Sequence, residues 1–98
     1  MGTAISSGIK TAGTYQINVG RGILSGLHAI SDGTNVATVT AYDNASGDTS
    51  GTVLAKVNGS VTTGSNGAIF TTPIRYDVGL TIVVAGTGTP QGIAYTGA

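Results

Sequence analysis

Short alternating segments, separated by clusters of turn residues, run through almost the whole chain. The stretch from Ser31 to Val57, SDGTNVATVTAYDNASGDTSGTVLAKV, holds two of them, each preceded by Gly, Ser, Asp and Asn. Alternation with β-branched residues is the period of a β-strand, and such clusters are typical of turns. No segment repeats its apolar residues with helical spacing, and the chain contains no Glu. The sequence therefore predicts an all-β fold.

The predicted strands follow one another at short intervals after residue 13. They cover residues 14–19, 22–30, 35–43, 52–57, 68–72, 74–78, 80–85 and 93–96. Gly26 interrupts the second segment and suggests a β-bulge, and Pro73 marks an edge or a strand start. About eight short strands in 98 residues predict a single-domain antiparallel β-sandwich that is jelly-roll-like.

The N-terminus differs in character from the rest of the chain. Residues 1–13 are small and polar with two isolated apolar residues, so we divide the chain into an extended N-terminal arm, residues 1–13, and a β-sandwich domain, residues 14–98. We expect the arm to dock on a partner, with Ile5 and Ile9 as apolar anchors and Lys10 as a polar contact, by adding a strand to a sheet edge. Alternatively, it folds back and covers an edge of its own sheet.

The composition favours association. The chain has four basic and four acidic residues, a net charge of zero and only 8% charged residues, and charge-poor neutral surfaces tend to associate. With 17 glycines and no cysteine, so small a domain has a thin stability margin that oligomerisation commonly supplements. We therefore expect a homo-oligomer, a trimer rather than a dimer.

The same composition argues against several other partners and places. Four scattered cations do not form the basic stripe that nucleic acid requires. No apolar run reaches the length of a membrane span, and the N-terminus lacks the pattern of a secretory signal. We expect a soluble protein, made in the cytoplasm, that binds neither nucleic acid nor membrane.

Candidate catalytic and metal-binding groups are few. Ser25, His28 and Asp32 suggest a nucleophile, base and orienting acid, but Ser25 and His28 point to opposite faces of an extended strand. The loop at residues 43–48 offers oxygen ligands, but Ala45 breaks the spacing of a calcium loop and no Glu follows. Neither glycine-rich stretch opens a helix that could hold a phosphate. We predict that the protein is not an enzyme and has no metal or cofactor.

A family resemblance adds a functional expectation. The succession GRGILSGLHAISDGTNVATVTAYDNASG, SGTVLAKV and FTTPIRYDVGLTIVVAGTG resembles small virion proteins of tailed bacteriophages, over roughly residues 15–95. The resemblance implies a capsid decoration or cement protein that binds the outer capsid surface as an oligomer and clamps subunits of the major capsid protein. A neck, tail or fibre protein is the alternative. A carbohydrate-binding β-sandwich is a further one, although the chain has no Trp, one Phe and four Tyr with which to stack on sugars.

Overall fold

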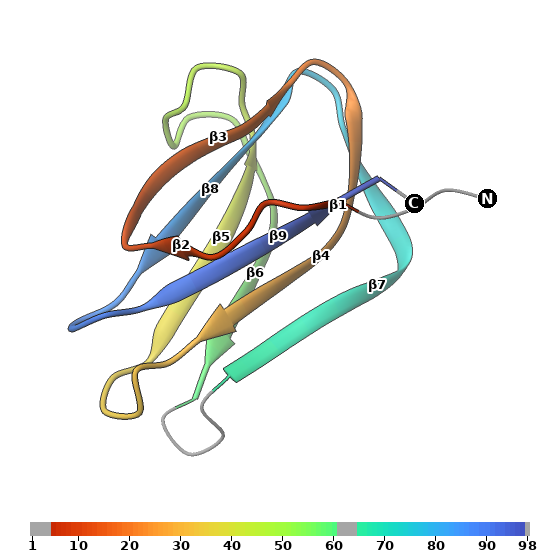
Figure 1. Cartoon of the computed structure of the whole chain (residues 1–98). Coiled ribbons are helices and arrows are strands. Elements are labelled where there is room, and N and C mark those ends of the chain that lie inside the picture. Colours follow the sequence, from red (N-terminus) through yellow and green to blue (C-terminus); the bar gives the residue numbers. More distant parts are fainter. Residues whose placement is uncertain (1–4, 61–64, 98) are drawn as a thin grey trace.

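The computed structural model describes residues 5–60 and 65–97, with the backbone alone over residues 65–72. These residues form strands and connecting turns without a helix, so the predicted all-β fold is confirmed (Figure 1). The strands are β1 (Ile5–Ser6), β2 (Lys10–Thr11), β3 (Gly13–Val19), β4 (Gly22–Ile30), β5 (Ala37–Asp43), β6 (Thr52–Gly59), β7 (Ser65–Tyr76), β8 (Gly79–Ala85) and β9 (Gln91–Thr96).

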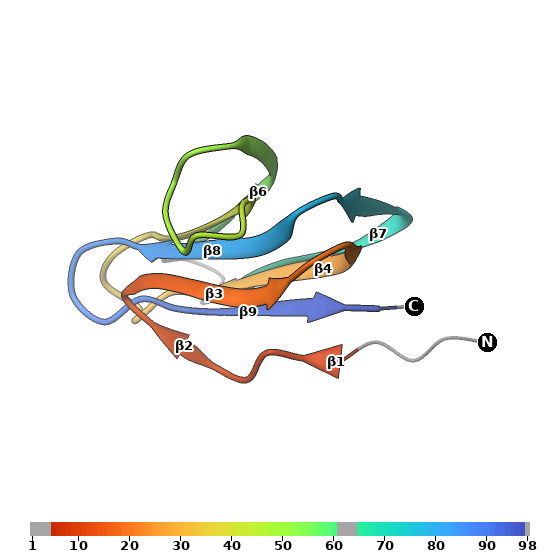
Figure 2. The same cartoon turned by 90° about the horizontal axis from the view of Figure 1, so that it is seen from above.

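The strands make two sheets, which lie one above the other in Figure 2. In sheet A the order is β1-β9-β4-β7, and β2 pairs with the same strand, β9, as β1 does. In sheet B the order is β3-β8-β5-β6. All the pairs are antiparallel. The predicted antiparallel β-sandwich is therefore confirmed.

The pairing is nested along the chain. β5 pairs with β6, β4 with β7, β3 with β8, and β1 and β2 with β9, as in one long antiparallel ribbon. The β4–β9 and β5–β8 pairs then join the folded ribbon into two sheets. If β1 and β2 are taken as one interrupted strand, this is the eight-strand arrangement of a jelly roll. Seven of the described strands lie outside the arm, so the arm supplies the eighth strand of this arrangement, interrupted into β1 and β2.

The core lies between the two sheets and comes mainly from β4, β5 and β8. Alternate residues of each strand face inward because successive side chains point to opposite faces, and burying a large apolar side chain contributes about 1.5–3 kcal/mol. On β5 the small residues face inward, so Thr38, Thr40 and Tyr42 are left on the outer face. The buried apolar residues are Leu24, Leu27, Ala29, Ala37, Val39, Ala41, Tyr76, Leu80, Ile82, Val84 and Ala94.

Several strand boundaries differ from the prediction, and two of the differences have a clear physical cause. Pro73 does not separate two strands, because β7 runs through it from Ser65 to Tyr76. The register with β4 passes from Leu24–Ile74 to Gly26–Ile69, so Pro73 lies in an irregular stretch of a strand at the sheet edge, where its missing N–H is tolerated. The bulge expected at Gly26 is confirmed by the register with β9, which passes from Leu24–Thr96 to Gly26–Tyr95 and leaves Ser25 as an extra residue of β4. β5 begins at Ala37 rather than at residue 35, because the Asn35 N–H donates to the Asp32 carboxylate.

Candidate interaction surface

The arm lies along the edge of β9 in its own chain. Ile5 is opposite Thr96 and Lys10 is opposite Gly92, so the arm contains one residue more than β9 between these pairs. The extra residue forms a bulge at Ser7, whose N–H donates to the Ala94 carbonyl (2.8 Å) and whose Oγ accepts from the Ala94 N–H (3.0 Å). This placement is the alternative that the sequence left open, a strand covering an edge of its own sheet.

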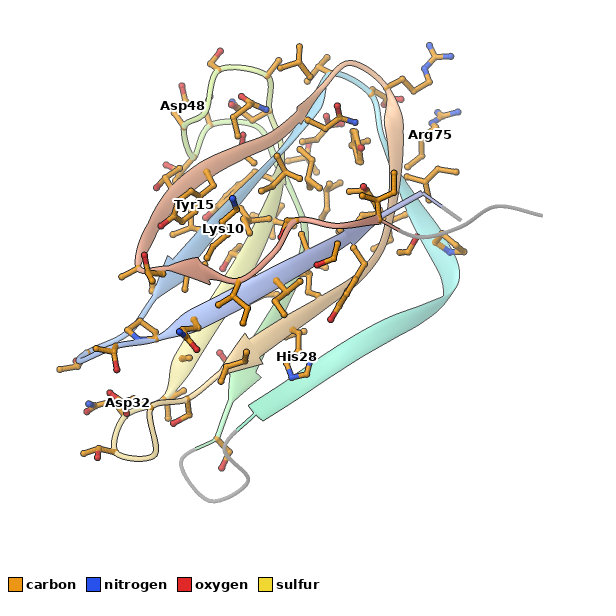
Figure 3. All side chains as sticks on the ribbon, viewed as in Figure 1. Lys10, Tyr15, His28, Asp32, Asp48 and Arg75 are labelled. Carbon is orange, nitrogen blue, oxygen red and sulfur yellow. The ribbon has the colours of Figure 1, made fainter. Side chains whose placement is uncertain are left out.

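The bulge separates the three residues predicted to bind a partner. Ile5 shares the inward side of sheet A with Thr96, whereas Ile9, next to Lys10, lies on the outer side. Ile5 is 67% exposed and Ile9 61% exposed, so both remain available to a partner. The Lys10 Nζ lies 5.5 Å from the centre of the Tyr15 ring, within cation–π distance, and Figure 3 shows the two side chains together. Docking on a partner through these residues stays a prediction.

The outer face of sheet A is an apolar surface that the sequence prediction missed. Ile93 lies opposite His28, and Tyr95 lies opposite Gly26. Ile30 lies opposite Gln91. Four large side chains of this face are only partly buried: His28, Ile30, Ile93 and Tyr95. Figure 3 shows His28 on this face. The signal was present in GILSGLHAI, which has apolar residues at both parities. The structure buries one side of this strand in the core and leaves the other side only partly buried.

The outer face of sheet B has a different character. Its outward positions on β3, β5 and β6 are mainly threonines, amides and one lysine, and Thr38 Oγ1 donates to Asn58 Oδ1 at 2.9 Å. The loop after β5 covers part of this face, where Thr81 Oγ1 donates to the Asn44 carbonyl (3.2 Å) and is fully buried. The two faces therefore offer different surfaces, one largely uncharged and apolar, the other polar and partly covered. The outward side chains of this face are Thr14, Gln16, Thr38, Thr40, Tyr42, Val53, Lys56, Asn58, Thr81 and Val83.

Asp32 fastens two loops at one end of the sandwich. Its carboxylate accepts from the Thr89 N–H (3.0 Å) on the β8–β9 loop and from the Thr34 and Asn35 N–H groups (2.9 and 2.8 Å) on its own loop. The hydrogen bond from Thr89, followed by those from Thr34 and Asn35, holds the pKa of Asp32 well below its usual value. This carboxylate is therefore anionic at neutral pH and is used within the fold.

The loops at the other end are fastened in a similar way. Asp43 accepts from the N–H groups of Asp77 (2.9 Å) and Val78 (3.0 Å) in the turn between β7 and β8. Burial raises the pKa of Asp43, but these hydrogen bonds outweigh it and lower the pKa overall. Asp48 accepts from Ser50 and from Asn44 Nδ2, and its pKa is also lowered, chiefly by Ser50. Both carboxylates thus act as braces for turns.

The residues considered for catalysis are not brought together as a triad. Ser25 is buried and its Oγ donates to the Gly97 carbonyl, while the Asp32 carboxylate holds the loop described above. Over residues 5–60 and 65–97 there is no cluster of three metal-ligating side chains and no pocket. Nor does this part of the chain contain a helix long and apolar enough to cross a membrane.

Comparison with protein-family models, with curated proteins and with solved structures finds no match for the chain.

Proposed function

We propose that the chain is a structural protein of a bacteriophage virion, a capsid decoration or cement protein. In this role it binds the outer capsid surface as an oligomer and clamps neighbouring subunits of the major capsid protein. The observation that carries the proposal is the surface formed by the outer face of sheet A and the adjoining arm. There Ile9 is 61% exposed beside the partly buried Ile93 and Tyr95. Together these side chains offer apolar contact without formal charge.

The dimensions and the construction of the sandwich support a clamping role. Its two longer extents are 36 and 29 Å, which bound a face of about 1,000 Å², comparable with the roughly 800 Å² that each partner buries in a standard interface. The loops at both ends are braced by Asp32 and Asp43, so the face is presented on a rigid frame. A preformed surface loses little conformational freedom on binding, which favours a permanent structural contact.

Two measurements test this function. Mass spectrometry of purified virions, from the phage whose genome encodes the chain, is expected to detect it among the structural proteins. Purified chain is then added to particles assembled without it, and co-sedimentation measures binding. Absence of the chain from virions, or failure of the wild-type chain to sediment with particles, would contradict the proposal. Cryo-electron microscopy showing the chain on the neck, tail or fibre instead would refute a capsid role.

A matched pair of variants assigns the binding face. Ile9→Asp adds one negative charge on the outer side of sheet A, and Thr14→Asp adds the same charge to an exposed position of sheet B. We expect Ile9→Asp to weaken binding by about tenfold or more, since a charge is then desolvated against an apolar surface. Thr14→Asp is expected to sediment like the wild type. Equal effects of the two variants would show that the outer face of sheet A is not the binding face.

A further inference from the structure

We propose that β1 and β2 are exchanged between copies of the chain, so that the arm of one copy pairs with β9 of the next. The closed arrangement seen in the single chain and the exchanged one contain the same strand pairs. They differ in which copy supplies the arm. This inference concerns how copies hold one another and does not depend on the virion role, because it is tested on the purified protein alone.

The edge of β9 requires an extended segment to cover it. Gly92 and Ala94 are buried in the present arrangement, and Ala94 uses both its N–H and its carbonyl oxygen to bind Ser7. Without the arm, this row of backbone groups would be an open sheet edge, which readily pairs with another strand. The structure shows which segment pairs with this edge, because β1 and β2, within residues 5–11, pair with β9 in a defined register.

The arm is held in place by few contacts. β1 and β2 contribute two residues each to the ladder, and the bulge at Ser7 and Gly8 separates them. Gly8 has a φ of 78°, and an added Cβ there would meet no other atom within 4 Å. The two isoleucines of the arm are more than half exposed, so they add little apolar burial. Local opening of a segment with so little buried surface costs less than opening of the core strands.

The corner between the arm and the domain is short and constrained. Only Ala12 separates β2, in sheet A, from β3, in sheet B. Gly13 has a φ of 149°, and a Cβ at this position would lie 3.3 Å from Tyr15 Oη. Short connections of this kind favour exchange, because a tight corner in the chain is then replaced by one extended strand. In the exchanged form β2 and β3 become one continuous strand that runs from one copy to the next.

A second copy is therefore the occupant that the observations favour. A second copy supplies the same arm, which can pair with β9 in the register Ser6–Tyr95, and its own β9 can accept the arm of the first copy. If two copies exchange arms reciprocally the result is a closed dimer, and if each passes its arm onward the result is a ring.

Single-cysteine variants detect the exchange directly, since the chain has no natural cysteine. Ser6 and Tyr95 are register partners, and the adjacent Ser7–Ala94 hydrogen bond makes theirs a non-hydrogen-bonded pair with closely spaced Cβ atoms. Tagged Ser6→Cys and untagged Tyr95→Cys chains are refolded together, oxidised with oxidised glutathione and separated on a non-reducing gel. We expect a disulfide-linked heterodimer, because the two sulfurs meet only when the arm of one copy lies on β9 of another.

Lys56→Cys serves as the control for random collision, because Lys56 is exposed on β6 of sheet B, away from the arm. The yield of heterodimer with Tyr95→Cys is expected to exceed that with Lys56→Cys by about tenfold. Equal yields would overturn the proposal. The double variant Ser6→Cys/Tyr95→Cys gives a second reading. A ladder of covalent oligomers that ends at the ring size supports exchange, and a product that is only intramolecular refutes it.

A pair of glycine substitutions tests the role of the corner. Gly13→Val penalises the positive φ and favours the extended conformation, so we expect it to increase the heterodimer yield severalfold. Gly20→Val introduces the same penalty at another corner, where φ is 96° and the added Cβ is free of contacts; it is expected to leave the yield unchanged. If both variants fold, by circular dichroism, and give equal yields, the conformation of this corner does not control exchange. If Gly13→Val does not fold, the cysteine pairs on the wild-type background still decide the question.

Discussion

Gly92 offers a quantitative test of how the two sheets pack. It lies on the inward side of β9, and a Cβ at this position would collide with Val39 Cγ2 and lie 3.0 Å from Val84 Cγ2. Gly92→Ala should therefore overpack the core at a cost of about 1–3 kcal/mol, offset by about 0.4–1 kcal/mol because alanine restricts the unfolded chain. Val39→Ala removes two methyl groups. At about 0.8 kcal/mol each, and with a further cost for the cavity, this should lower the free energy of unfolding by about 2–3 kcal/mol.

The double variant distinguishes packing from simple addition. Independent effects would lower the free energy of unfolding by about 3–5 kcal/mol in total. If the alanine methyl at position 92 occupies the space left by Val39, we expect a loss of only about 1–2 kcal/mol, hence a coupling of about 2 kcal/mol. Urea unfolding with the m-value checked for each variant measures this. The pair Gly92→Ala/Val84→Ala should couple less strongly, and additivity of the Val39 pair would refute the close approach of β9 to β5.

Three further expectations concern polar and exposed groups. The pKa of Asp32 is lowered, chiefly by the hydrogen bond from the Thr89 N–H. The contribution of this carboxylate to stability is therefore present above about pH 4 and is lost as the pH falls through the lowered pKa of the folded state. Asp32→Asn should lower the melting temperature at pH 7 and make the melting temperature decrease less steeply in acid. Tyr76→Phe removes the acceptor of the Asn18 Nδ2 hydrogen bond (2.7 Å) while leaving the ring buried, and should cost about 0.5–1.5 kcal/mol in urea unfolding; a loss above about 3 kcal/mol would indicate a repacked core. Ile9→Ser should change the free energy of unfolding by less than about 0.5 kcal/mol, because the side chain is 61% exposed.

The central strands could be predicted because their local patterns agree with their environment. β4 has the predicted bounds, Gly22–Ile30, and Gly26 marked its bulge. β5 and β8 were predicted to within two residues at each end, since alternation and flanking turn residues both favour a strand there. The nesting of the strand pairs is a property of the whole ribbon, and the order of strands in each sheet is not encoded in any single segment.

The remaining features depend on contacts between distant residues. Pro73 looked like a boundary because it lacks an N–H, but its place in an irregular edge stretch follows from the register with β4. The arm was expected to add a strand to a sheet edge, but its own sequence could not identify that edge, because the pairing depends on β9, which is distant in the chain. The apolar outer face of sheet A had a signal in His28 and Ile30, yet only the positions of the two sheets decide which side of β4 stays uncovered.

The nested ribbon also sets an order in time. Its innermost hairpin, β5–β6, closes a short loop, whereas β1 and β2 must meet β9, which is made much later than the arm. Pairs of large sequence separation form slowly because loop closure is entropically costly. During synthesis the arm therefore remains unpaired with its own chain until β9 has emerged. On a polysome, a neighbouring chain whose β9 has already been made can pair with the arm of a growing chain before that chain has made its own β9. The translation rate would then influence which arms pair with which chains.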